Sequence, residues 1–413
     1  MLKHHLVALA TLLFTLSAPS FAGITELSSR GHIPQAPRQT PEGLACDLPK
    51  VWQSERVNIA FPKAPLVIGK DRVYTASDSV TALDRATGEK LWRFVPHGRF
   101  TNQDALDADG SLALLLDDSG EVLYFGGYQK AVYALNAKTG EEIWHTPTMN
   151  RTGTGIVLEG IAQDKIRVYA ATPGRIYALD KKDGSVAWEF MMPENEHGQM
   201  HPPQLADDGT LYTHSGFKLY ALDAKTGHIK WSYEPPARPD RMEGHPRLRY
   251  DVLSHIYKDW VFVVEIDGMI SAVNRHTGKV EWQVDGNPIT FGVPYFTTTP
   301  EGNLIVKTGA NLMLLDIARH KIDWWFSGNA SARPRPVALY KNLALFGTDG
   351  RYIYALNRTT GDEVFRHQFD RDTTGGVRTL IAEGDVLYFL GLDGRVYAYR
   401  LACPQLEGVD IGK

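Results

Sequence analysis

Residues 84–92 read Asp84-Arg-Ala-Thr87-Gly88-Glu-Lys-Leu-Trp92, and this short phrase returns along the chain. Its pattern is Asp or Asn after Leu, two variable residues, Thr-Gly, three variable residues and Trp. Further copies end at Trp144, Trp188, Trp231 and Trp282. Two copies have drifted, because one carries His320 where Gly is expected and the other ends in Phe365. The copies recur about every 45 residues, which indicates an internal repeat.

The residues around each copy alternate in the way that β-strands do. Upstream lie an apolar strand, a short turn and a second strand, as in residues 168–171 and 176–180. Tyr, Val, Ile and Phe at every second position, bounded by Gly, Asp and Pro, predict strands. No stretch of ten or more residues shows a helical period. Units of this length with several short strands each are typical of four-stranded β-propeller blades.

Each position of the phrase has a physical reason. Asp or Asn can accept hydrogen bonds from backbone amides two or three residues on, and Gly permits a positive φ. Trp offers a large flat surface that can wedge against the neighbouring blade. We expect structural wedges, rather than ligand-binding side chains, at Trp52, Trp92, Trp144, Trp188, Trp231, Trp282, Trp324 and Phe365.

The number of blades follows from the two ends of the chain. Seven copies run from Trp92 to Phe365, and no Trp strand follows the last strand pair, at residues 386–389 and 396–399. The missing strand lies near the N-terminus, around Trp52. An open stack of sheets would expose two apolar faces. We therefore predict an all-β fold, an eight-bladed β-propeller of four-stranded antiparallel blades over residues 46–404, closed by the N-terminal strand in the last blade.

The two cysteines lie at this predicted closure. Aligning the two ends of the chain with the blade that ends at Trp231 puts Cys403 opposite Thr226 and Cys46 opposite Lys225, which are neighbours in one turn. A Cys46–Cys403 disulfide would lock the ring, and closing a loop this long is worth about 5 kcal/mol in the loop-entropy model. Two free thiols or a metal-binding pair are the alternatives.

The first residues read as a secretion signal. Lys3 precedes an apolar run over residues 6–16, and Ser20-Phe21-Ala22 supplies small residues for cleavage. We predict three segments outside the propeller: a signal peptide over residues 1–22, an extended tail over 23–45 and a C-terminal tail over 405–413. No Cys follows the apolar run, so we expect no lipid anchor, and no later stretch is long enough to span a membrane. We expect export to the periplasm of a Gram-negative bacterium, where the cysteines can pair.

Composition and charge exclude several classes of protein. With 43% hydrophobic and 22% charged residues, the chain resembles an ordinary globular protein rather than a disordered segment or a membrane bundle. Its 44 Lys and Arg against 48 Asp and Glu argue against nucleic-acid binding through net positive charge. The chain has no Gly-x-Ser-x-Gly, no His-Glu-x-x-His and no phosphate-binding Gly loop. We predict no catalytic residues and favour a non-enzymatic role.

The repeated Leu-Asp-x-x-Thr-Gly-x-x-x-Trp phrase resembles the PQQ-like repeat of quinoprotein-type β-propellers, over nearly all of residues 48–403. Two branches of that family matter. The BamB-type branch implies a non-enzymatic eight-bladed propeller of the machinery that inserts outer-membrane proteins. The quinoprotein alcohol dehydrogenases imply PQQ and calcium on the propeller axis. This chain has only two cysteines and therefore no vicinal Cys-Cys ring, so we place it nearest the BamB type and predict no cofactor, with PQQ as the less favoured alternative.

Charged residues in the connections between blades are the candidates for a binding rim. The connections lead towards the central channel, and the longest one carries Arg247 and Arg249. A ring of such side chains could bind an anion or an acidic loop of a partner. The predicted ligand or partner rim comprises His201, Arg247, Arg249, Arg335 and Arg378. The alternative is that these residues only satisfy loop carbonyls and surface solvation.

Metal binding is a weaker hypothesis. His197, Met200 and His201 are suitable soft-metal ligands, but their spacing matches no standard site, and chance clustering is the favoured interpretation. Residues 107–110 and 207–209 resemble the start of a calcium loop without its later ligands, so we interpret them as turns. We therefore predict no metal site.

The sequence thus predicts an exported, non-enzymatic propeller scaffold that binds other proteins of the bacterial cell envelope, in outer-membrane protein assembly for example. We expect an envelope protein as partner, no nucleic acid, no membrane span, and a monomer when alone. The alternative is a PQQ-, metal- or small-molecule-binding propeller, with dehydrogenase activity as its least favoured form.

Overall fold

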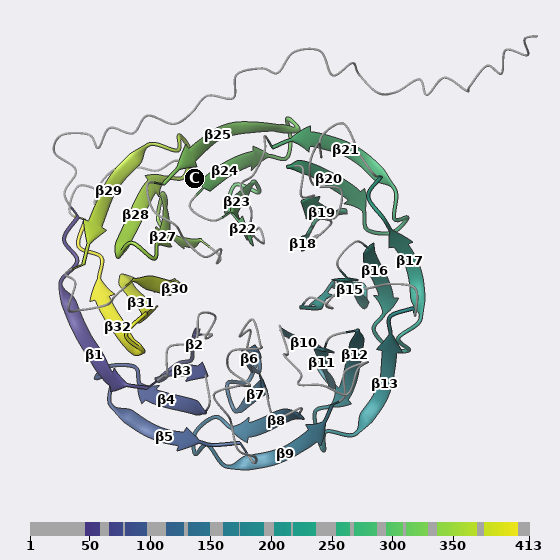
Figure 1. The fold of residues 1–413 in the computed structure, drawn as a ribbon, viewed down its shortest axis with the longest axis horizontal. Helices are drawn as coiled ribbons and strands as arrows, with labels where there is room; N and C mark the ends of the chain where they lie inside the picture. The colour runs from purple at the N-terminus through teal and green to yellow at the C-terminus, as the bar shows by residue number, and fades with distance from the viewer. Residues whose placement is uncertain are drawn as a thin grey trace, which may run out of the picture. The chain divides into compact units, whose positions relative to one another are not determined.

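Eight antiparallel sheets of four strands each follow one another around a ring in the computed structural model (Figure 1). The described residues contain no helix. All the described residues belong to one compact unit. The structure describes residues 46–57, 66–76, 79–96, 113–127, 131–148, 160–172, 174–193, 202–215, 218–236, 253–264, 268–286, 295–308, 311–328, 337–369 and 376–403.

Each sheet is one blade, and its first strand lies nearest the axis of the ring (Figure 1). Blade 1 contains β2 (Leu66–Ile68), β3 (Arg72–Ala76), β4 (Val80–Asp84) and β5 (Lys90–Phe94). Blade 2 contains β6 (Ala113–Leu116), β7 (Val122–Gly127), β8 (Ala131–Asn136) and β9 (Glu142–Pro147). Blade 3 contains β10 (Ile161–Gln163), β11 (Arg167–Thr172), β12 (Arg175–Asp180) and β13 (Val186–Met191). Blade 4 contains β14 (Gln204–Leu205), β15 (Thr210–Ser215), β16 (Lys218–Asp223) and β17 (Ile229–Tyr233).

The second half of the ring has the same organisation, apart from its last strand. Blade 5 contains β18 (Leu253–Tyr257), β19 (Trp260–Val264), β20 (Met269–Asn274) and β21 (Val280–Asp285). Blade 6 contains β22 (Tyr295–Thr298), β23 (Leu304–Thr308), β24 (Asn311–Asp316) and β25 (Lys321–Ser327). Blade 7 contains β26 (Ala338–Tyr340), β27 (Leu343–Gly347), β28 (Tyr352–Asn357) and β29 (Glu363–Gln368). Blade 8 contains β30 (Val377–Glu383), β31 (Val386–Gly391), β32 (Arg395–Arg400) and β1 (Lys50–Arg56).

The ring closes in blade 8 through strands from opposite ends of the chain. β1 pairs antiparallel with β32, so that Trp52 lies opposite Ala398 and Gln53 opposite Tyr397. Just beyond this pair, Cys46 and Cys403 form a disulfide with their Cα atoms 4.4 Å apart. The predicted eight-bladed architecture and its N-terminal closing strand are confirmed. The predicted signal peptide (1–22), most of the tail (23–45) and the C-terminal tail (405–413) lie outside the described residues.

The core is a series of layers between adjacent blades. In blade 1, Val73 and Leu83 pack with Trp52 of blade 8, whereas the alternating side chain of Tyr74 packs towards blade 2 with Leu123. Both faces of each middle strand are therefore buried, which explains why these strands are continuously apolar in sequence.

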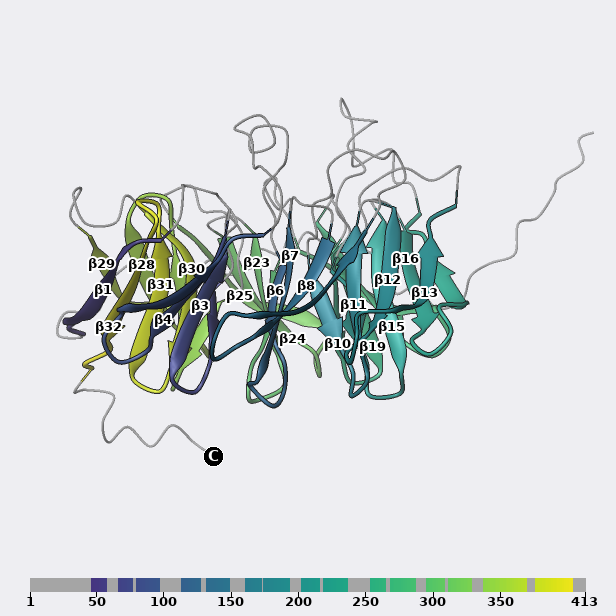
Figure 2. The same cartoon turned by 90° about the horizontal axis from the view of Figure 1, so that it is seen from below.

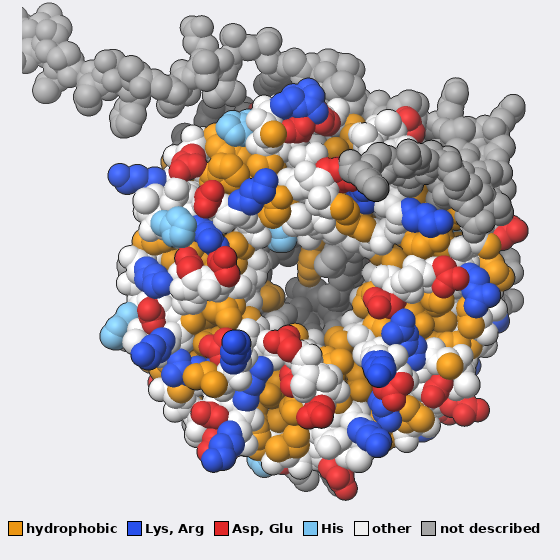
Figure 3. Space-filling model, turned by 180° about the vertical axis from the view of Figure 1, so that it is seen from behind, with side chains coloured by type: hydrophobic (Ala, Val, Ile, Leu, Met, Phe, Trp, Pro, Cys, Tyr) orange, Lys and Arg blue, Asp and Glu red, His pale blue; other side chains and the backbone are white. Residues whose placement is uncertain are grey.

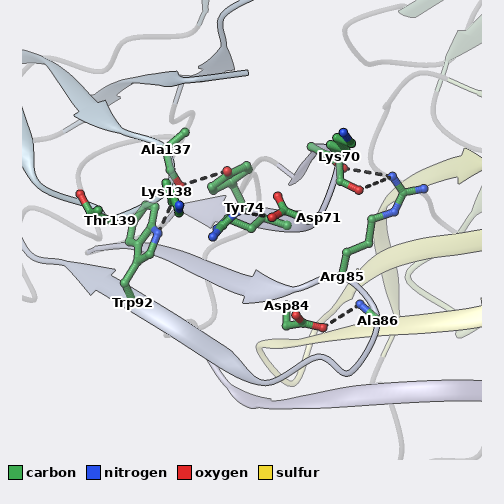
Figure 4. A network of polar contacts seen from close by, with 12 residues as sticks. Lys70, Asp71, Tyr74, Asp84, Arg85, Ala86, Trp92, Ala137, Lys138 and Thr139 are labelled. Carbon is green, nitrogen blue, oxygen red and sulfur yellow. Dashed lines mark hydrogen bonds and ion pairs between the residues drawn. The ribbon is translucent and has the colours of Figure 1, made fainter. Parts of the chain in front are cut away.

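The repeated phrase forms the joint between one blade and the next (Figure 4). In blade 1, Asp84 accepts hydrogen bonds from the amides of Ala86 and Thr87, both at 2.9 Å, which shapes the turn and lowers the pKa of Asp84. The Trp92 indole donates to the backbone oxygen of Ala137 in blade 2 at 3.2 Å. The same oxygen accepts the hydroxyl of Tyr74 at 3.1 Å. A Trp and a Tyr thus hold one turn of the next blade.

Glycine is required in these turns for two separate reasons. Gly140, in the turn that receives Trp92, has φ of +77°, which strains any residue with a side chain. A Cβ there would also lie 2.6 Å from the Trp92 ring. The same indole-to-carbonyl bond recurs at six joints: Trp52 to Arg85, Trp92 to Ala137, Trp144 to Lys181, Trp188 to Ala224, Trp231 to Arg275 and Trp324 to Arg358.

The two drifted copies of the phrase make two different joints. Trp282 stacks on the ring of His320 at 4.2 Å between centroids, and its buried indole nitrogen has no hydrogen-bond partner in the described part of the chain. Phe365 packs in a cluster that includes Leu48, Leu401 and Cys403. At that joint the disulfide-linked chain ends take the place of the turn that carries glycine in blades 1–5 and 7 and His320 in blade 6.

Candidate functional site: the loop face of the ring

The ring has two unlike faces (Figure 2). On one, which we call the turn face, short turns connect the first strand of a blade to the second, and the third to the fourth. The other, which we call the loop face, is where each outer strand ends and the first strand of the next blade begins. The segments between these strand ends are longer, up to the stretch between Tyr233 and Leu253. Long connections on a rigid frame are where binding residues concentrate.

Polar side chains are buried where the second strands reach the loop face. These strands are apolar towards the turn face, because Tyr, Val and Leu fill the layers between blades. Their other ends carry buried side chains that need hydrogen bonds. They are Thr75, Thr172, Thr213, His214, Ser215, Lys307, Thr308 and Thr348. The loop face is therefore the chemically polar end of the core.

Lys307 is the most unusual of these residues. Its side chain in β23 is only 1% exposed, and its Nζ lies 5.8 Å from the centroid of the Phe346 ring in blade 7. An aromatic face stabilises a buried ammonium group, which is otherwise costly to remove from water. The sequence analysis missed Lys307, although a lysine inside the apolar strand of residues 304–308 is a visible signal.

His255 is a second group whose chemistry is changed by its surroundings. In β18 its ring stacks on Phe296 of the neighbouring blade at 5.4 Å, and its Nε2 lies 2.9 Å from the hydroxyl of Thr298. Burial lowers the pKa of His255 to about 4, because the charged imidazolium loses its hydration there. His255 is therefore neutral at pH 7 and joins blade 5 to blade 6 near the axis.

Most residues of the predicted rim lie outside the described residues. This holds for His201, Arg247, Arg249 and Arg335. Arg378 lies in β30, but its side chain belongs to the undescribed part. In sequence, His201, Arg247, Arg249 and Arg335 fall between the last strand of one blade and the first strand of the next. The rim stays a prediction about side chains.

The metal hypothesis has the same standing. His197, Met200 and His201 lie outside the described residues. Within the residues that the structure describes, no group of three or more His, Cys, Asp or Glu side chains could hold a metal ion. His214 in β15 is buried and belongs to no such group there. Asp207 and Asp208 occupy a turn, as predicted, and Asp207 binds Arg275 at 2.7 Å.

The turn face carries charges of both signs. Lys and Arg alternate with Asp and Glu around the central opening, and hydrophobic side chains lie between them (Figure 3). A surface of this kind has no extended positive field for nucleic acid. No helix in the described stretches is long and apolar enough to cross a bilayer.

Comparison with known proteins now assigns the family. A family model described as "Outer membrane protein assembly factor BamB" matches residues 50–155, 76–249, 128–285 and 266–403. These matches overlap and together run through all eight blades. The chain belongs to the BamB family. The family resemblance expected from the repeated phrase is confirmed.

Individual BamB proteins are distant relatives of this chain. The outer membrane protein assembly factor BamB of Shewanella oneidensis is 23% identical over 332 residues, covering 78% of this chain and 79% of that protein. BamB of Yersinia pestis is 20% identical over 335 residues, covering 78% and 79%. The crystal structure of BamB from Moraxella catarrhalis superimposes with a TM-score of 0.65 at 17% identity, covering 86% of this chain and all of that chain.

Quinoproteins share the fold as well. The crystal structure of quinohemoprotein alcohol dehydrogenase from Comamonas testosteroni gives a TM-score of 0.67 at 15% identity, covering 86% of this chain and 76% of that chain. At this identity the likeness concerns the fold alone. The BamB relatives, in contrast, match this chain over most of their length.

Proposed function

We propose that this protein is a non-enzymatic scaffold of the bacterial cell envelope that binds other proteins of outer-membrane protein assembly. The observation that carries the proposal is the BamB family match across residues 50–403. The relatives that match over most of their length are named as assembly factors. We further propose that the protein works in the periplasm and is a monomer when alone.

We propose the loop face as the surface that binds the partner. The turn face consists of short, tightly hydrogen-bonded turns whose charges are of mixed sign. The loop face carries the long segments between blades, and the segment between Tyr233 and Leu253 contains Arg247 and Arg249. Arginine side chains bind carboxylates with two parallel hydrogen bonds, which suits an acidic segment of a protein partner.

Site-specific photocrosslinking in intact cells tests this proposal. A photoreactive phenylalanine replaces Arg249 in one variant and Lys138 in a matched control, because Lys138 is exposed on the turn face. We expect the Arg249 position to crosslink a subunit of the β-barrel assembly machinery and the Lys138 position to give none. Crosslinks from Lys138 alone would move the binding surface to the turn face. No crosslink to an assembly subunit from either position would contradict the proposed function.

A propeller that binds PQQ, a metal ion or another small molecule is the second candidate. It is supported by a 28% identity over 163 residues with the dehydrogenase subunit of an alcohol dehydrogenase (quinone) from Komagataeibacter europaeus, although this match covers only 21% of that protein. Titration of the purified protein with PQQ and Ca²⁺, followed by tryptophan fluorescence, separates the candidates. Saturable quenching at micromolar PQQ would favour the second candidate, and its absence favours the scaffold.

A further inference from the structure

One position of the repeated turn alternates around the ring. The residue after the Asp or Asn donates its amide to the first-to-second strand turn of its own blade in seven of the eight blades. In the odd-numbered blades this residue is a cation: Arg85, Lys181, Arg275 and Arg358. In the even-numbered blades the corresponding residue is apolar: Ala137, Ala224, Ile317 and Leu401. The repeat is thus two blades long rather than one.

The first-to-second strand turns alternate with the same period. In the odd-numbered blades the turn carries a lysine: Lys70, Lys165, Lys258 and Lys341. In the even-numbered blades it carries acidic residues and a glycine of positive φ: Gly120, Gly209, Gly302 and Gly384. At each joint the acidic turn of an even-numbered blade therefore neighbours an odd-numbered blade.

At four joints, the cation of the repeated turn in an odd-numbered blade contacts side chains in or near the first-to-second strand turn of the preceding blade, directly or through an intermediary. We call this contact a clasp. Between blades 4 and 5, Arg275 binds Asp207 at 2.7 Å, and this hydrogen bond lowers the pKa of Asp207. Between blades 6 and 7, Arg358 pairs with Glu301.

The other two clasps use an intermediary or a second contact. Between blades 8 and 1, Arg85 donates to the Tyr388 hydroxyl at 3.2 Å and lies 4.0 Å from Glu383. Between blades 2 and 3, Lys181 donates to the Gln163 side chain at 2.8 Å, and Gln163 donates to Asp118 at 3.1 Å.

The four alternate joints, 1–2, 3–4, 5–6 and 7–8, lack this clasp. Across each of them, no ion pair joins described residues of the two blades. Two of them have other polar contacts: at the 3–4 joint Arg167 donates to the backbone oxygens of Ala224 and Lys225 at 3.1 and 2.8 Å, and at the 7–8 joint the Val377 amide donates to the Thr348 oxygen at 3.0 Å. The wedges follow the same division. Trp52, Trp144 and Trp324 at clasped joints are 3–8% exposed, and Trp231 is partly exposed. At the alternate joints Trp92, Trp188 and Trp282 are partly exposed, whereas Phe365 at the 7–8 joint is 5% exposed.

We infer that the propeller contains four two-blade units, blades 8–1, 2–3, 4–5 and 6–7, each held by a clasp, and that the 1–2 and 5–6 joints open more readily than the joints within these units. In each unit the residue whose carbonyl receives the indole is also held through its side chain. Each clasp has a solvent-exposed partner, so it stabilises its joint by only about two- to fivefold. Local opening of the ring then concentrates at the 1–2 and 5–6 joints, where the described residues make no ion pair and no guanidinium contact between blades.

Hydrogen exchange of the indole N–H groups tests the inference on the unmodified protein. Each of the seven joint tryptophans carries one such proton, which ¹⁵N-tryptophan labelling makes visible by NMR. We expect Trp52, Trp144, Trp231 and Trp324 to exchange more slowly than Trp92, by about two- to fivefold, with Trp282 fastest. Trp92 exchanging as slowly as Trp52 and Trp324 would overturn the inference.

Substitutions of Arg275 and Asp207 test whether the clasp, rather than burial of the indole alone, slows the exchange of Trp231. Arg275→Met keeps the aliphatic part of the side chain, and we expect it to speed the exchange of Trp231 by about two- to fivefold while Trp188 is unchanged. The double variant Asp207→Arg/Arg275→Asp should restore slow exchange. Lys138→Met removes an exposed cation at the 1–2 joint and is the matched control, with no effect expected on Trp92. Unchanged Trp231 exchange in Arg275→Met would refute the clasp.

Discussion

The two joints that flank blade 5 show how far one repeated phrase can drift while the ring stays closed. At the 4–5 joint, Trp231 donates to the Arg275 oxygen at 2.9 Å, and Tyr212 donates to the same oxygen at 2.8 Å. At the 5–6 joint, Trp282 has no acceptor in the described part of the chain, and Phe262 stands where Tyr212 does.

The drifted joint is compensated by ring stacking instead of hydrogen bonds. His320 replaces the turn glycine and keeps a positive φ of 51°, and its ring lies flat on Trp282. Nearer the axis, the stacked pair of His255 and Phe296 adds a second aromatic contact between the same blades. A joint can therefore be held by geometry-specific hydrogen bonds or by stacked rings, and the two should respond differently to mutation and to pH.

The largest expected effect concerns the glycine of the complete joint. Gly278 has φ of +70°, and a Cβ there would lie 2.8 Å from the Trp231 ring. Gly278→Val should lower the free energy of unfolding by about 2–4 kcal/mol, because it combines backbone strain with a clash. Urea unfolding measures this loss. Gly120→Val is the control, since Gly120 has φ of +76° with nothing within 4 Å of a Cβ, and should cost about 1 kcal/mol.

The next effect is a pH dependence that belongs to the drifted joint. Because the folded pKa of His255 is about 4, below the ordinary histidine value of 6.5, the unfolded chain binds the proton more readily. Stability contributed by neutral His255 is complete above pH 6.5 and is lost as the pH falls towards 4. The described partners of its ring, Phe296 and Thr298, carry no charge that would oppose this. We expect about 1–2 kcal/mol less stability at pH 5 than at pH 7.

His255→Gln separates this contribution from the general effect of acid. Glutamine can still form a hydrogen bond with Thr298 and does not titrate. Urea midpoints at pH 7, 6 and 5 should fall less steeply in this variant than in the unmodified protein. Equal slopes would mean that His255 titrates normally in the folded state.

The smallest effect compares the two wedges directly. Trp231→Phe removes an indole bond, whereas Trp282→Phe removes a buried N–H that has no acceptor among the described residues. We expect Trp231→Phe to be more destabilising than Trp282→Phe by about 1 kcal/mol, since a net hydrogen bond is worth about that much. Thermal unfolding of both variants is sufficient, and equal losses would show that ring volume alone determines the joint.

The sequence predicts the fold well because the information about it is local and repeated. The Asp-to-Trp phrase encodes a turn and a wedge within nine residues, and the seven copies specify where each blade ends. The closing strand could be predicted because the last blade lacked a Trp strand and Trp52 was the remaining wedge residue. The Cys46–Cys403 pairing was predicted from the same alignment of the chain ends.

The joints and the loop face could not be predicted in the same way. The clasp between Asp207 and Arg275 joins side chains of two different blades that are 68 residues apart in sequence. Nothing within one repeat encodes that relation. Lys307 was overlooked for a different reason: a strand pattern is identified from its apolar residues, and the contact of Lys307 with the ring of Phe346 comes from the next blade.

The closing strand also has a consequence for biosynthesis. A ribosome produces Lys50–Arg56 among the first residues of the propeller, yet its pairing partner Arg395–Arg400 is produced last. Blades 1–7 can therefore form before blade 8 is complete. Until then, strand Lys50–Arg56 lacks its pairing partner. A nascent chain interrupted anywhere before residue 395 leaves that strand permanently unpaired, so such fragments should be the species that quality-control proteases meet.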